Sequence, residues 1–140
     1  MKNVEPLVVS PRAALGVAAL GAIAYPSLEI LWRGYSHPSM AAAGAAACRL
    51  LDLHNALYAG QPRLLRAAAC AWLILLVEFI VGVMVNLFLN LSVWDYSAMP
   101  LNLLGQICPA YAALWYLLAL AFILVFDRVR AEVREAAATA

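Results

Sequence analysis

The sequence predicts an all-α, polytopic membrane protein built as a bundle of four transmembrane helices. Of its 140 residues, 66% are apolar and only 12% are charged, whereas charged residues make up about 25% of an ordinary soluble domain. A soluble chain this short could not bury so much apolar surface in one core. Several apolar runs also approach the roughly 20 residues that a helix needs to cross the hydrocarbon layer of a bilayer.

Four apolar segments account for most of the chain, and we treat residues 1–140 as a single membrane domain. The first segment follows Ser10-Pro11, which suits a helix start because proline is tolerated in the first helical turn. The third segment is long enough to tilt in the membrane. The expected helices cover residues 13–32, 38–58, 64–91 and 101–126, and a polar, alanine-rich helical tail covers residues 127–140.

The second segment has a rival interpretation, because Arg49, Asp52, His54 and Asn55 interrupt it. An Arg or Asp near the centre of a helix costs about 2.5–3.5 kcal/mol on the insertion scale. The segment can therefore span only if neighbouring helices take up its charges. Otherwise it lies in the interface or re-enters the membrane from one side.

The distribution of basic residues gives an orientation for both arrangements. With four spans, one side holds Arg33 and the other side holds every other basic residue except Arg49 within the second segment. The excess of Lys and Arg in cytoplasmic loops then places both termini inside. With three spans the N-terminus lies outside, but the C-terminus stays inside and the loop 92–100 stays outside. We expect a multi-pass protein of a bacterial plasma membrane.

The stretch from Glu78 to Pro109 carries polar groups that lipid cannot satisfy. Glu78 lies about halfway along the third segment, and Asn86 follows it on the same helix face. Asn102 and Gln106 are spaced i,i+4 and would share a face of the fourth segment. Because ionisable residues within a membrane are functional by default, we expect a solute-binding site centred on Glu78. Its expected residues are Glu78, Asn86, Asp95, Tyr96, Asn102 and Gln106. The alternative is that the amides only form hydrogen bonds between helices.

Two further pairs of charges suggest structural ion pairs. Arg49 lies at a depth similar to that of Glu78 if both helices span, so these two can pair, either to serve a substrate or to fix helix register. Asp52 is an alternative partner for Arg49 at i,i+3, and Glu29 precedes Arg33 at i,i+4. The small residues from Ala41 to Ala47 form a close-packing surface, for a helix of the same chain or for self-association.

Several motifs are absent. The sequence contains no GxxxxGK[ST] loop, so we expect no direct nucleotide binding. Neither GxSxG nor HExxH occurs, and no histidines or cysteines stand at metal-ligand spacing. The basic residues lie at segment ends and form no patch for nucleic acid. We therefore expect no cofactor, no metal and no enzyme activity.

The order of the sequence blocks resembles a known bacterial family. An acid precedes WRGYSHPSM (Trp32–Met40), a small-residue helix follows, and then come EFIVGVMVNLFLNLSVWDYSAMPLNLLGQICP (Glu78–Pro109) and a helix with Trp115. This is similar to the family labelled putative ABC-transporter type IV, the CmpB-like membrane proteins, most specifically in VWDYS and PLNLLGQICP. The first loop departs from the family, with Tyr35-Ser36 in place of Arg-Thr. The positions that match the family's blocks are Arg33, His37, Glu78, Asn86, Trp94, Asp95, Tyr96, Asn102 and Gln106.

The resemblance implies a transport-associated protein of the inner membrane. One hypothesis is a small transporter or permease-like subunit that works as a homo-oligomer or with other membrane subunits in the lipid bilayer. The alternative is an accessory protein that packs against a larger partner, and an intramembrane enzyme is the least favoured. If the chain transports, the central carboxylate favours a cation, a proton-coupled solute or a polar neutral molecule.

Overall fold

The computed structural model describes residues 11–139, without the side chains of residues 13, 126, 129, 130 and 132–139. This part of the chain folds into four α-helices, which are α1 (Pro11–Arg33), α2 (Pro38–Leu57), α3 (Arg63–Gly82) and α4 (Pro109–Thr139). A π-helical turn, η1 (Val83–Phe88), continues α3. The predicted all-α fold with four helices is confirmed.

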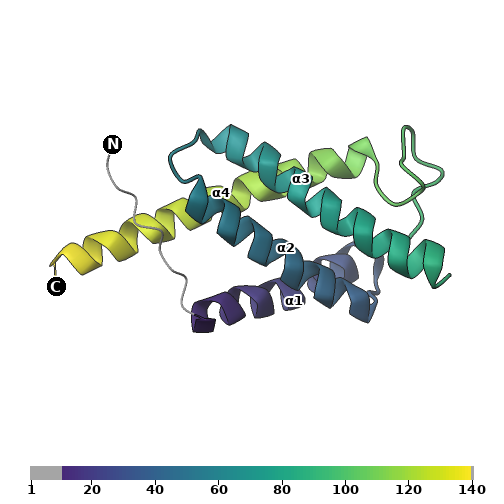
Figure 1. Ribbon diagram of the computed structural model, residues 1–140, viewed down its shortest axis with the longest axis horizontal. Coiled ribbons are helices and arrows are strands. Elements are labelled where there is room, and N and C mark those ends of the chain that lie inside the picture. Colours follow the sequence, from purple (N-terminus) through teal and green to yellow (C-terminus); the bar gives the residue numbers. More distant parts are fainter. Residues whose placement is uncertain (1–10, 140) are drawn as a thin grey trace.

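The connections between the helices define two ends of the bundle (Figure 1). Residues 34–37 and the long loop 89–108 lie together at what we call the loop end. Residues 58–62 lie at the opposite end, the turn end, together with the start of α1 and the end of α4. The helices therefore run alternately in opposite directions, as a chain that passes back and forth through one layer does.

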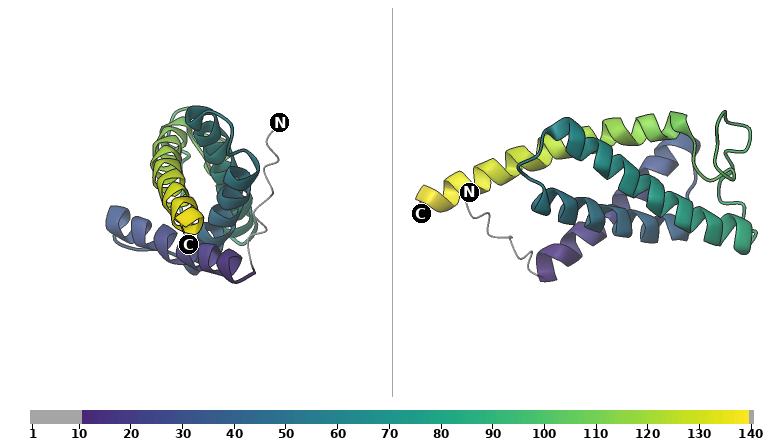
Figure 2. Two further views of the ribbon diagram at one scale, coloured as in Figure 1. Left: turned by 90° about the vertical axis from the view of Figure 1, so that its left-hand side faces the viewer. Right: turned by 45° about the horizontal axis from the view of Figure 1, so that its top comes forward.

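The helices pack in chain order, α1 on α2, α2 on α3 and α3 on α4. Helix α1 crosses the others obliquely (Figure 2). It meets α2 where Gly21 faces Gly44, and a Cβ on either glycine would overlap the backbone carbonyl of the other. The small-residue surface of α2 is thus used for packing within the chain.

Two apolar clusters fill the space between the helices. One joins α2, α3 and α4 around Ala67, Cys70 and Ile123. The other lies toward the loop end and contains Met40, Val77 and Trp94. Trp94 belongs to the loop 89–108, so this loop contributes to the core as well as connecting two helices.

The fourth helix begins at Pro109, and the expectation that it begins near residue 101 is wrong. Leu101, Leu104 and Gly105 have φ values of +55°, +51° and +69°, which a right-handed helix excludes. Leu103 and Ile107 instead form a short antiparallel bridge. Proline disfavours helical backbone in the residue before it and suits the first position of a helix, so the chain becomes helical at Pro109.

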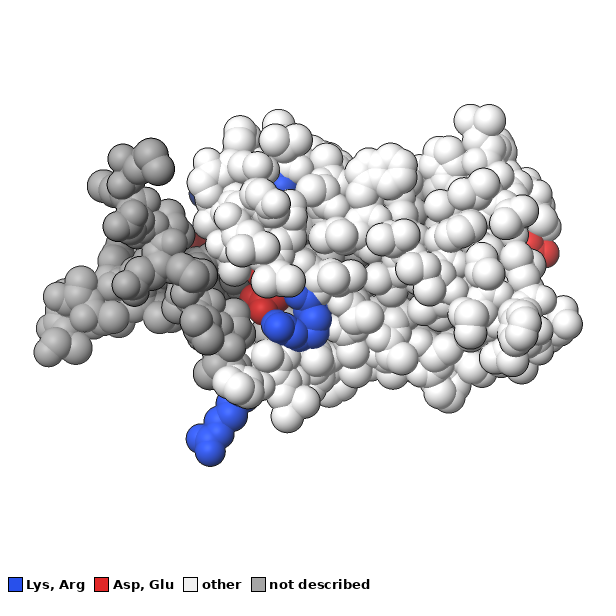
Figure 3. All heavy atoms as spheres, in the orientation of Figure 1, with Lys and Arg blue, Asp and Glu red and all other residues white. Residues whose placement is uncertain are grey.

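Two described helical stretches have the length and apolar composition to cross a membrane, Ala14–Arg33 and Arg63–Phe88, and Pro109–Val125 forms a shorter apolar helix. Helix α2 is not among these candidate spans. On the face drawn in Figure 3, charged side chains gather toward the turn end, and most of the remaining surface is uncharged, apart from an acidic patch at the loop end.

Candidate functional site

Glu78 lies on the inner side of α3 and is only 2% exposed. The hydroxyl of Tyr25 on α1 donates to its Oε1 at 2.5 Å, and the indole Nε1 of Trp115 on α4 donates to its Oε2 at 2.8 Å. The two rings lie side by side, with their centroids 5.3 Å apart. Hydrogen bonds offset part of the cost of removing a carboxylate from water, so three helices cooperate to hold this group.

A cavity of about 320 Å³ opens beside this carboxylate, between α1 and α4. Glu78 comes from α3, and Tyr96 comes from the long loop. Tyr96 stacks on Tyr111 of α4 at 4.5 Å between ring centroids. Helices α1 and α4 are not among the closely packed helix pairs, so their side chains, and not their backbones, meet here. The complete lining consists of Tyr25, Leu28, Glu29, Trp32, Arg33, Glu78, Tyr96, Tyr111, Leu114, Trp115 and Leu118.

An ion pair forms the part of the cavity near the loop end. Arg33 Nη2 donates to Glu29 Oε1 at 2.7 Å, and Ser36 Oγ donates to the other carboxylate oxygen at 2.5 Å. Arg33 Nη1 also donates to the carbonyl of Val93 at 3.0 Å, which fixes the end of α1 to the long loop. Arg33 is therefore compensated by Glu29, whereas none of the salt bridges among the described side chains includes Glu78.

The expected pairing of Arg49 with Glu78 is wrong. Arg49 Nη1 donates to Asp52 Oδ2 at 2.6 Å, the i,i+3 alternative. The reason is axial position. The two helices meet at the turn end, where α2 ends at Leu57 and α3 begins at Arg63. Counted from there, Glu78 lies seven residues further along its helix than Arg49 does. At about 1.5 Å per residue, this places the two charges about 10 Å apart along the bundle.

Asn86 and Gln106 contact each other and not the cavity. Asn86 Nδ2 donates to Gln106 Oε1 at 2.8 Å, and Asn86 Oδ1 accepts from the backbone N–H of Val93 at 2.6 Å. The indole of Trp94 donates to the carbonyl of Gln106 at 3.0 Å. Gly82 faces both Gln106 and Trp94, and a Cβ there would overlap them. These groups fasten the long loop onto the π-helical turn.

Asn102 and Asp95 stabilise the same loop from within. Asn102 donates to the carbonyls of Ser97 and Met99 and accepts from the N–H of Gly105 at 2.8 Å. Asp95 accepts hydrogen bonds from the backbone N–H and the hydroxyl of Ser97. The bond from the backbone N–H is the main reason that the pKa of the exposed Asp95 carboxyl is lowered. The expected shared helix face of Asn102 and Gln106 is wrong, because both residues precede α4.

Of the six residues expected to bind solute, the structure therefore brings only Glu78 and Tyr96 to one cavity. Sequence reasoning missed Tyr25 and Tyr111 as site residues, and it used Trp115 only as part of the family resemblance. The spacing offered a partial signal, since Tyr25 stands four residues before Glu29 and Tyr111 four before Trp115. Residues four apart share a helix face.

A second polar group, the Arg66 cluster (Asn55, Arg63, Arg66 and Asp127), lies at the turn end. Arg66 is 1% exposed, and its guanidinium donates to Asn55 Oδ1 at 3.0 and 3.1 Å. It also donates to both carboxylate oxygens of Asp127, at 2.9 and 3.0 Å. Arg63 adds a longer contact to Asp127 at 3.2 Å. Hydrogen bonds from Arg66 are the main reason that the pKa of Asp127 is lowered.

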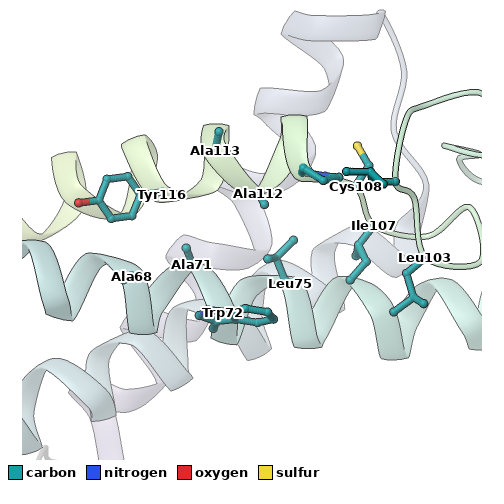
Figure 4. A pocket seen from close by; sticks show the side chains of 12 residues that line it. Ala68, Ala71, Trp72, Leu75, Leu103, Ile107, Cys108, Ala112, Ala113 and Tyr116 are labelled. Carbon is teal, nitrogen blue, oxygen red and sulfur yellow. The ribbon is translucent and has the colours of Figure 1, made fainter.

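A further cavity, of about 460 Å³, lies between α3 and α4 near the start of α4 (Figure 4). Its wall has no charged residue, and alanines from both helices make up a third of it. The lining residues are Ala68, Ala71, Trp72, Leu75, Leu101, Leu103, Ile107, Cys108, Pro109, Ala112, Ala113 and Tyr116. This apolar surface lacks the polar groups that would orient a solute.

Comparison with known proteins identifies the family. Residues 22–139 match the family described as "Putative ABC-transporter type IV", so the chain belongs to it, and the resemblance drawn from the sequence blocks is confirmed. No curated protein matches the chain. No solved structure matches it either.

Proposed function

We propose that this member of the "Putative ABC-transporter type IV" family is a four-span membrane protein that takes part in solute transport and binds its solute beside Glu78. The observation that carries the proposal is a buried carboxylate on the wall of a cavity, with no salt-bridge partner among the side chains that the structure describes. An ionisable group within a membrane bundle is costly, and such groups mark solute and ion pathways. The family description supports a role in transport.

The proposed topology has both termini in the cytoplasm. The alternating direction of the helices supports it, since α2 runs between α1 and α3 at the same level of the bundle (Figure 1). Described basic residues at the turn end include Arg12, Arg63, Arg66 and Arg128, whereas Arg33 lies at the loop end. The positive-inside rule then places the turn end in the cytoplasm. Asp52 compensates Arg49, which lowers the cost of inserting α2.

Reporter domains that work only in the cytoplasm, fused in turn to each terminus and inserted in the turn 58–62, test this topology. Activity at all three positions is expected. An inactive reporter at the N-terminus with an active one at the C-terminus would establish the three-span arrangement instead.

Flux measurements test the transport role. Purified protein is reconstituted into proteoliposomes and offered a panel of cationic, neutral and anionic solutes, with the Glu78→Gln variant in parallel. We expect flux of at least one solute, and we expect the variant to lose it. Because the sequence contains no P-loop, transport against the solute's gradient would draw its energy from another chain or from an ion gradient. Full activity in Glu78→Gln would remove Glu78 from the site.

The accessory role is the second candidate, and the apolar cavity between α3 and α4 favours it. Its alanines would let a partner helix approach closely, as small residues do in membrane interfaces. Purification separates the two roles. A homo-oligomer with flux supports transport, whereas absence of flux together with a stoichiometric foreign subunit supports the accessory role. We propose no enzyme activity, since the donors to Glu78 are an indole and a phenol and no nucleophile is paired with a base there.

A further inference from the structure

We propose that the cavity beside Glu78 binds an organic cation that carries apolar or aromatic groups. This inference rests on the proposed function, because it assigns a ligand class to the same site. Three observations carry it: the charge balance of the cavity wall, the identity of its rings, and the apolar residues between them.

With Glu78 ionised, the charge balance of the cavity wall leaves one negative charge, on this carboxylate. Three charged residues line the cavity, namely Glu29, Arg33 and Glu78. Glu29 and Arg33 form an ion pair at 2.7 Å, so together they add no net charge to the cavity wall. Glu78 has only neutral donors, one on each oxygen. Each carboxylate oxygen has two lone pairs, so a second acceptor position remains on both. A cation is the ligand that this surplus favours.

Aromatic rings surround that carboxylate. Tyr25 and Trp115 flank it directly, and the stacked pair of Tyr96 and Tyr111 stands toward the loop end. With Trp32, five of the eleven lining residues are aromatic. The faces of aromatic rings carry partial negative charge and attract cations within about 6 Å, which is how proteins recognise quaternary ammonium groups. A ring lining therefore adds to the preference set by Glu78.

The remaining wall selects against small inorganic ions. Leu28, Leu114 and Leu118 complete the lining, and these three residues offer no ligand atoms to a hydrated ion. A Ca²⁺ or Mg²⁺ site needs several oxygen ligands, and no group of three metal-binding side chains occurs among the described residues. The volume of about 320 Å³ is close to the lower limit of small-molecule sites, about 300 Å³. This suits a compact ligand with one ring or several alkyl groups.

Equilibrium dialysis of the full-length protein in detergent tests the inference. The probe is radiolabelled benzyltrimethylammonium, and the competitors are neopentylbenzene, which has the same shape without the charge, and the anion benzenesulfonate. We expect saturable binding of the cation that an excess of unlabelled cation displaces and that neither competitor displaces. Equal displacement by neopentylbenzene would overturn the inference, because shape alone would then explain binding. This comparison uses the unmodified chain and needs no variant to fold.

Variants assign the binding to the proposed residues. Glu78→Gln removes the charge and keeps the shape, and we expect it to weaken binding by about tenfold or more. Tyr111→Leu removes a ring that is not one of the two hydrogen-bond donors to Glu78, and we expect a loss of about threefold, in keeping with one exposed cation–π contact. Asp95→Asn is the matched control, since this carboxylate lies outside the cavity, and it should bind as the parent does. Parent-like affinity in folded Glu78→Gln would overturn the assignment.

Comparison with the flux panel separates this inference from the proposed function. Glu78-dependent flux of a neutral or anionic solute, without cation binding, refutes the ligand class and leaves transport intact. Cation binding without flux of any solute supports the ligand class and counts against transport. If neither binding nor flux occurs, both proposals fall.

Discussion

Single replacements in the Arg66 cluster should destabilise the protein strongly, and their summed loss of stability should exceed the loss in the double replacement. We choose Arg66→Met and Asp127→Leu, alone and together. Arg66 is buried at the turn end, and its guanidinium donates hydrogen bonds to Asn55 and to both carboxylate oxygens of Asp127. Each single replacement removes one charge and leaves the other without its main partner. The double replacement removes both.

The structure sets the size of the effect. Among the described side chains, loss of Asp127 leaves Arg66, 1% exposed, with the neutral Asn55 as its remaining hydrogen-bond partner. Removing one partner of a buried pair costs about 3–5 kcal/mol, and because the side chain of Asp127 is 21% exposed we expect the lower end of that range. Loss of Arg66 destabilises the remaining Asp127 carboxylate less, because Arg63 still forms a salt bridge with it. However, it leaves the buried Oδ1 of Asn55 unsatisfied, which adds about 1–3 kcal/mol.

We therefore expect a coupling free energy of about 2 kcal/mol between the two positions, within the range of about 0.5–3 kcal/mol seen for residues in contact. The free energy of unfolding is measured by titration with sodium dodecyl sulfate in mixed micelles, for the parent, both single variants and the double variant. Coupling below about 0.5 kcal/mol would refute the reasoning, because the two charges would then be acting independently.

Three further predictions follow from the same structure. Gly21→Ala should lower the free energy of unfolding by about 1–3 kcal/mol through overpacking against Gly44, whereas Gly16→Ala, in open space, should not; equal effects in the same titration would contradict this. Arg66 lowers the pKa of Asp127, so the stabilisation by this carboxylate is complete above its unfolded pKa of about 3.9 and disappears as the pH falls through the lower folded value. The stability difference between the parent and Asp127→Asn, measured from pH 7 to pH 2, should shrink accordingly, and a constant difference would argue against it. Arg49→Met and Glu78→Gln should be additive in folded yield, and a clear coupling between them would restore their pairing.

Composition and long apolar runs were sufficient to predict the first three helices. The starts of α1, α2 and α3 differ from expectation by no more than two residues, since Pro11, Pro38 and Pro62 mark them locally. The start of α4 was missed by eight residues. Residues 101–108 are as apolar as a helix, but their non-helical path is held by hydrogen bonds from Asn86 and Trp94 to Gln106 and from Asn102 to the carbonyl of Ser97. Such tertiary support leaves no periodic signal in the sequence.

The site was only partly predictable, for a similar reason. A lone carboxylate in an apolar helix is visible in any sequence, so Glu78 was found. Its donors, however, lie 53 and 37 residues away on α1 and α4, and which helix faces meet depends on the close approach of α1 and α2 at Gly21 and Gly44. The amides of Asn86 and Gln106 are equally conspicuous in the sequence, but both form hydrogen bonds that hold the long loop in place. Residue type alone does not distinguish a polar side chain that is free to bind a ligand from one that holds a loop in place.

The same residues that allow Glu78 to be buried also shape the cavity for a ligand. A carboxylate within an apolar bundle needs donors, and most donor side chains would bring further polar surface with them. Tyrosine and tryptophan bring one donor each on a large apolar body, so Tyr25 and Trp115 satisfy the carboxylate and still present rings to the space beside it. A charged partner, such as the one that Asp52 provides for Arg49, would instead have neutralised the site. The carboxylate without a charged partner and its ring-lined surroundings thus have a single structural origin, which makes the proposed cation-binding site compatible with so apolar a chain.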